Sequence, residues 1–161
     1  MICVPTIMHS GTHVLRYRVL KPFMDDMVKF HLTECDRFKR ELDELPIFTS
    51  LRHPRRIMES YRRRAELKRK TRYPHDRATL DWQFRELIDN ISKRSPLYLH
   101  VDDECKHIEV DVMEEFLGRP LGRDFSVSLE TNARCGTHDV DIDDCPEVPQ
   151  EYIDFYYGTM M

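Results

Sequence analysis

Short apolar runs alternate along the chain with segments in which apolar residues recur every three or four positions. A short apolar run between polar turns predicts a buried strand, and the wider spacing predicts an amphipathic helix. The expected strands are Ile2 to Ile7, Met27 to Leu32, Ile47 to Leu51 and Leu97 to Val101. The expected helices are Thr12 to Val19, Glu34 to Leu45, a long helix from Pro54, a helix from Leu80 to Ile91, and Ile108 to Leu117.

The order of these elements predicts the fold class. Strands that alternate with helices favour right-handed crossovers and a mainly parallel central sheet between helices, which is a three-layer α/β/α fold. Pro54 suits the first turn of its helix, where a missing N–H costs nothing, and Gly118 is typical of a left-handed helix cap. At 161 residues we expect a single domain, 1–161. The acidic segment 139–161 has little pattern, and we expect it to be mostly irregular.

Charge is distributed unevenly, although the formal net charge is only −4. From Arg52 to Arg72 ten residues are basic, and only Glu59 and Glu66 are acidic. Beyond Arg134 the chain has no lysine or arginine. The middle of the chain is therefore expected to attract anions, whereas the C-terminal segment repels them.

The cysteines and the apolar runs indicate a cytoplasmic protein. Five cysteines are scattered without a CxxC pair, which argues for a reducing compartment and against a disulfide framework or a zinc site. Pro5 and His9 interrupt the one apolar run near the start, so we expect no signal peptide. No apolar run reaches the roughly 18 residues that span a bilayer, so we expect no membrane partner.

Three polar clusters fall at the ends of expected strands: IMHSGTH at 7–13, KFHLTE at 29–34 and LRHPRRIMES at 51–60. In a parallel sheet, ligands bind at the carboxyl ends of the strands. The SGT turn is a helix cap or, more specifically, a phosphate-binding loop, because it exposes backbone N–H groups at a helix N-terminus. Arg52 and Ser60 are either part of a solvated basic helix or a phosphate clamp, in which a guanidinium and a hydroxyl donate to the same anion.

These three clusters, in this order, resemble the sulfotransferases that use 3′-phosphoadenosine 5′-phosphosulfate as donor, a family with a fold like that of P-loop NTPases. MHSGTHVL at 8–15 aligns without a gap with the family loop PKSGTTWL. KFHL at 29–32 is similar to the KTHLP motif, and RHPRRIMESY at 52–61 keeps the spacing of the RNPxxxxxSY motif. LYLHVDDE and EEFLGRPLG look like later family elements, so that the resemblance covers Ile2 to Gly122.

The resemblance implies a role for each motif residue. The 5′-phosphosulfate would be held by Ser10, Gly11, Thr12 and His13, and the 3′-phosphate by Arg52 and Ser60. His31 would be the catalytic base that takes the proton from the acceptor hydroxyl. Lys29 would steady negative charge on the leaving group or the donor. No metal is implied.

His9 is the main departure from the family pattern. The family has lysine or arginine at this position, directed at the charge that develops on the leaving phosphate, and a histidine supplies that charge only when it is protonated. Three alternatives follow: bound phosphates keep His9 cationic, Lys29 replaces it, or the protein is a weak catalyst. The family's late RKGxxGDWK element is echoed by Arg134, Cys135 and Gly136, which makes Arg134 a further candidate donor ligand.

The motifs predict sulfuryl transfer from this donor to an unknown hydroxyl or amine acceptor. One alternative is a protein that keeps the nucleotide site without efficient turnover. A small P-loop-type kinase is disfavoured, because the SGT turn lacks the first glycine and the lysine of GxxxxGK[ST]. The basic helix from Arg55 to Arg72 offers a third alternative, electrostatic and salt-sensitive binding of a polyanion. We expect no nucleic-acid partner and leave a homodimer open.

Overall fold

The computed structural model describes residues 1–10, 26–68, 70–102, 110–120 and 140–160. The described strands are β1 (Ile2–Thr6), β2 (Met27–His31), β3 (Phe48–Leu51) and β4 (Leu97–His100). The described α-helices are α1 (Lys39–Glu44), α2 (Pro54–Glu66), α3 (Arg77–Asp89), α4 (Val110–Leu117) and α5 (Gln150–Gly158). Short 3-10 turns are η2 (Leu32–Glu34), η3 (Ile91–Arg94) and η5 (Ile142–Asp144).

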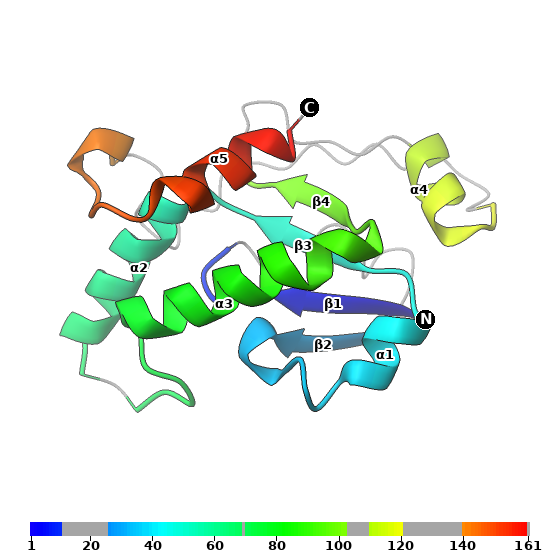
Figure 1. Cartoon of the computed structure of the whole chain (residues 1–161), viewed down its shortest axis with the longest axis horizontal. Helices are drawn as coiled ribbons and strands as arrows, with labels where there is room; N and C mark the ends of the chain where they lie inside the picture. The colour runs from blue at the N-terminus through cyan, green and yellow to red at the C-terminus, as the bar shows by residue number, and fades with distance from the viewer. Residues whose placement is uncertain (11–25, 69, 103–109, 121–139, 161) are drawn as a thin grey trace.

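The strands are parallel and bring their carboxyl ends to one edge. Strand β1 pairs with β2, and β3 pairs with β4. A parallel bridge joins Cys3 of β1 to Ile47, and the Cys3 N–H donates to the carbonyl oxygen of Pro46 over 2.9 Å. The strands therefore lie in the order β2, β1, β3, β4 (Figure 1). A mixed α/β structure with parallel strands is confirmed.

Helix α3 packs against the strands through one apolar face (Figure 1). Its residues Leu80, Phe84 and Leu87 recur every three or four positions and are almost fully buried. They share one core cluster with Cys3 of β1 and Leu51 of β3. Since burying such a side chain contributes roughly 1.5–3 kcal/mol, this face holds α3 firmly against the strands.

The helix expected over Glu34 to Leu45 is wrong in its first part. Residues Leu32–Glu34 form the turn η2, and α1 begins only at Lys39. The cause is local: the Glu34 carboxylate accepts a hydrogen bond of 3.1 Å from the His31 N–H, which closes the turn onto the end of β2. The other expected strands and helices of the described residues are present, and Gly118 has the left-handed φ of 67°. The helix expected over Thr12 to Val19 lies outside the described residues.

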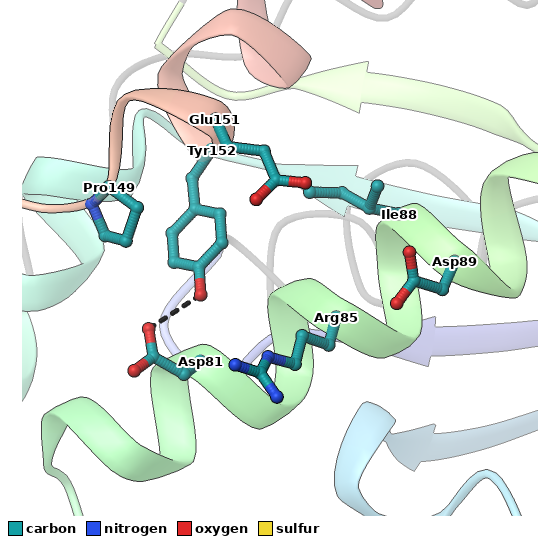
Figure 2. Close-up of a pocket in the computed structure, with 7 residues that line it drawn as sticks. All are labelled: Asp81, Arg85, Ile88, Asp89, Pro149, Glu151 and Tyr152. Atoms are coloured by element: carbon teal, nitrogen blue, oxygen red, sulfur yellow. Dashed lines mark hydrogen bonds between the residues drawn. The ribbon is translucent and has the colours of Figure 1, made fainter.

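The expectation of a mostly irregular C-terminal segment is wrong for α5. Tyr152 and Tyr156 lie one helical turn apart, and both are buried. The Tyr152 ring stacks on Phe84 of α3 with a centroid separation of 4.5 Å. Its hydroxyl donates a hydrogen bond of 2.7 Å to Asp81, drawn as a dashed line in Figure 2. The acidic composition hides this pattern, because the two tyrosines stand among carboxylates that face solvent.

The described residues contain no helix long and apolar enough to cross a membrane. They also contain no group of three His, Cys, Asp or Glu side chains placed to hold a metal ion. Cys3, Cys35 and Cys145 are buried and unbridged.

Candidate functional site

Four polar residues stand where the parallel strands end. His9 follows β1, His31 is the last residue of β2, Arg52 follows β3, and Asp102 follows β4. Because the carboxyl ends of parallel strands share one edge, these residues belong to the same end of the structure. Helix α2 begins at this edge and adds Ser60 to it (Figure 1).

His9 connects the first polar cluster to the third. Its Nδ1 lies 2.7 Å from the Ser60 hydroxyl oxygen. The Arg52 guanidinium donates to the His9 carbonyl oxygen over 3.4 Å. His9 also has the positive φ of 62°, an uncommon conformation for a residue with a side chain, so the chain turns sharply here. The structure thus brings together His9, Arg52 and Ser60, which the sequence places in separate motifs.

Ser10 shapes the turn rather than presenting a free hydroxyl. It is fully buried, and its Oγ donates to the Ile7 carbonyl oxygen over 2.7 Å and lies 3.0 Å from the Ser50 hydroxyl of β3. One residue earlier in the turn than His9, the Met8 N–H donates to the Gln83 side chain of α3 over 2.8 Å. The turn after β1 is therefore held from both β3 and α3.

Asp102 organises the charged groups at the start of α2. Its Oδ1 lies 3.7 Å from Arg52 Nε and accepts a hydrogen bond of 3.2 Å from Arg56. Its Oδ2 accepts from the His53 N–H over 2.5 Å and from the Tyr156 hydroxyl over 3.3 Å. Asp102 was not among the predicted site residues. Its position was a usable sequence signal, because Asp102 directly follows the last expected strand and ligands bind at the carboxyl ends of parallel strands.

Lys29 and His31 lie on the same face of β2, because side chains two apart on a strand point the same way. Nδ1 of His31 is buried and has no hydrogen-bond partner among the described residues. Burial, followed by the positive charge of Lys29, lowers the pKa of His31 below its ordinary value. The ring is therefore neutral at neutral pH, the state in which an imidazole accepts a proton.

His9 is also neutral in the protein as it stands. Burial lowers its pKa to about 4, and the charges of Arg64 and Arg52, together with those of His75 and His31 when these are protonated, act in the same direction. The site around His9 is thus rich in cationic groups. A positive charge on His9 itself requires a bound anion to offset them.

His75 lies in the polar segment before α3 and was not among the predicted site residues. Its Nε2 is 3.0 Å from Nε2 of His9, and its ring stands edge-on to Tyr61 with a centroid separation of 5.3 Å. No local sequence signal identifies it, because the contact depends on how the segment after α2 returns to the strand edge.

Much of the charge on α2 is compensated within the chain. Arg62 and Arg63 both pair with Glu59, at 2.7 and 3.1 Å. Arg55 donates to the carbonyl oxygen of Cys145 over 2.6 Å. Because of these contacts, α2 has less positive charge available to bind a polyanion than its sequence predicts.

A cavity of about 200 Å³ lies between α3 and the start of α5 (Figure 2). Its walls are mostly charged, and none of the predicted site residues lines it. The lining residues are Asp81, Arg85, Ile88, Asp89, Pro149, Glu151 and Tyr152.

Four of the predicted donor ligands lie outside the described residues: Gly11, Thr12, His13 and Arg134. No protein-family model, curated protein or solved structure matches the chain. The geometry of the described residues and the sequence motifs are therefore the basis for inferring a function.

Proposed function

We propose that the protein is a sulfotransferase that moves a sulfuryl group from 3′-phosphoadenosine 5′-phosphosulfate to a hydroxyl or amine acceptor. The contact of His9 with Ser60 and Arg52 carries this proposal. It joins the loop assigned to the 5′-phosphosulfate with the pair assigned to the 3′-phosphate. A donor with phosphates at both ends of its ribose needs two anion sites in one place.

The electrostatics of the site support an anionic ligand. Arg52 and Arg64 are positively charged and act on His9, and His75 and His31 add to this effect only when they are protonated. Clustered cations raise the local concentration of an anion and strengthen its binding where water is excluded. In this proposal, Arg52 and Ser60 donate to the 3′-phosphate, and backbone N–H groups after His9 donate to the 5′-phosphosulfate.

His31 is the base of the proposed transfer. The acceptor oxygen attacks sulfur and forms a new S–O bond, and the S–O bond to the donor phosphate breaks. The acceptor proton passes to a ring nitrogen of His31, which is neutral at working pH. The leaving group is 3′-phosphoadenosine 5′-phosphate, whose added negative charge Lys29 and the site's other cations stabilise.

The proposed fold is the three-layer, P-loop-like one of the sulfotransferases. Parallel strands in the order β2, β1, β3, β4, with α2 following β3 and α3 packed on the strands, are compatible with it. The turn after β1 occupies the position of a phosphate loop in such a fold.

The test is transfer of ³⁵S from labelled donor to a panel of hydroxyl and amine acceptors, with and without magnesium. The proposal predicts label in at least one acceptor, no need for magnesium, and loss of transfer in His31→Ala. Phosphoryl transfer from ATP that requires magnesium, with no transfer of sulfur, would favour the kinase alternative instead.

A further inference from the structure

We propose that His75 and His9 form a histidine pair that takes up one proton when the anionic donor binds. This inference rests on the proposed function, because the donor supplies the negative charge that draws the proton. His75 is a positioning residue in this account: it acts through His9 and is assigned no contact with the donor.

The geometry of the pair allows one hydrogen atom between the two Nε2 atoms of His9 and His75. The two Nε2 atoms are 3.0 Å apart, which is the length of a hydrogen bond between ring nitrogens. Nδ1 of His9 lies 2.7 Å from the Ser60 hydroxyl, so both His9 nitrogens have a partner. In the neutral pair, one Nε2 donates and the other accepts.

One further proton fits without rearrangement. A protonated His9 donates from Nδ1 to the Ser60 oxygen and from Nε2 to the lone pair of His75, so every contact is kept. A second proton would place two N–H groups face to face at 3.0 Å and break the contact. The pair therefore has room for one proton and no more.

The charged groups around the pair explain why it stays neutral until an anionic ligand binds. His9 faces Arg52 after β3, Arg64 of α2 and His31 of β2, all of which disfavour a positive charge on it. His75 faces Arg64, which acts in the same direction, and Asp76, which acts in the opposite one. A bound phosphosulfate adds negative charge beside the pair, and this charge favours its protonated form.

Donor affinity then depends on pH with a definite sign. Where the free pair is neutral and the bound pair is protonated, each rise of one pH unit weakens binding by about tenfold, because one proton is taken up per donor bound. This contribution vanishes at a pH low enough to protonate the free pair.

The test is calorimetric titration with 3′-phosphoadenosine 5′-phosphate at pH 7.5, in buffers with different ionisation enthalpies. The dependence of the heat on the buffer gives the number of protons taken up. Most of the ligand's own phosphate protons, with a pKa of about 6, are already lost at this pH. The variants are His75→Phe, which cannot accept from His9, and His75→Gln, whose amide oxygen can.

We expect about one proton taken up by the natural protein and by His75→Gln, and close to none by His75→Phe. His100→Gln is the matched control, since His100 also bonds a hydroxyl, that of Thr159 at 2.8 Å, and should behave like the natural protein. Thermal melts of all variants establish that they are folded. Binding with equal proton uptake in both His75 variants would overturn this inference alone, whereas no binding to the natural protein would overturn the proposed function and this inference together.

Discussion

Nδ1 of His9 lies 2.7 Å from the hydroxyl oxygen of Ser60, although 51 positions separate the two residues in the chain. The contact ties the turn after β1 to the second turn of α2. Two motifs that are separate in the sequence are therefore in contact, and we expect a change in either one to affect binding of the proposed donor.

The first prediction concerns the 3′-phosphate. Arg52→Ala should weaken binding of 3′-phosphoadenosine 5′-phosphate by about 10- to 100-fold, because a hydrogen bond to a charged group contributes about 1.5–3 kcal/mol. Affinity for AMP, which lacks the 3′-phosphate, should hardly change. Ser60→Ala should give a smaller loss with the same selectivity. Calorimetry with both nucleotides measures this.

Arg62→Ala is the control for the arginine substitution. Arg62 is on α2, the helix that carries Ser60, but its side chain is 51% exposed and pairs with Glu59 and Glu66. Its loss should leave both affinities unchanged. If Arg52→Ala weakened AMP as much as the 3′-phosphorylated nucleotide, the assignment of Arg52 to the 3′-phosphate would be wrong.

The second prediction separates binding from chemistry. His31→Ala should slow sulfuryl transfer by about 10²- to 10⁴-fold, the usual contribution of a general base, and should leave nucleotide affinity within about twofold. Single-turnover transfer from labelled donor and calorimetry give the two values. Full turnover in this variant would remove His31 from the mechanism.

The third prediction is a loss of stability in mild acid. The pKa of His9 is about 4 in the folded protein and 6.5 in an ordinary histidine, so between these values the unfolded chain binds more protons. The contribution of neutral His9 to the free energy of unfolding is therefore fully present above pH 6.5, and it is lost as the pH falls toward 4. At pH 5 the loss attributable to His9 is about 2 kcal/mol.

Urea unfolding of the natural protein and of His9→Asn at pH 7.5 and 5.0 measures this loss. Asparagine suits the comparison because it tolerates the left-handed conformation of His9. The variant should lose less stability between the two pH values than the natural protein does. Equal losses would mean that His9 is not the group responsible.

The fourth prediction concerns the C-terminal helix. Tyr152→Ala should lower the free energy of unfolding by about 3–5 kcal/mol, since it removes a buried ring stacked on Phe84. Tyr152→Phe keeps the ring and loses only the hydrogen bond to Asp81, so it should lower the free energy of unfolding by about 1 kcal/mol. Tyr157→Ala, at a side chain that is 50% exposed on the same helix, should cost less than either. A small effect of Tyr152→Ala would mean that α5 is not anchored as described.

The strands and α2 were predictable because their signals are local. Strands β1 and β3 are short, buried segments that end close to turn residues, and Pro54 marks the first turn of α2. The motifs also singled out His9, Arg52 and Ser60 as candidates, and the structure brings these three residues into contact through the parallel pairing of distant segments.

Other features had no sufficient local signal. The His75 contact depends on the path of the segment between α2 and α3, and the role of Asp102 depends on which arginines reach the end of β4. Helix α5 was missed because its acidic composition outweighs two buried tyrosines at helical spacing. Glu34, a good helix former, closes a turn instead because the His31 N–H lies within reach of its carboxylate.

The measurement that tests the proposed donor site most directly is calorimetric titration of the natural protein with 3′-phosphoadenosine 5′-phosphate, with AMP and ATP with magnesium as comparisons. We predict binding of the 3′-phosphorylated nucleotide that is at least tenfold tighter than binding of AMP and needs no metal. Binding of ATP with magnesium alone, or of none of the three, would contradict the donor site built from His9, Arg52 and Ser60.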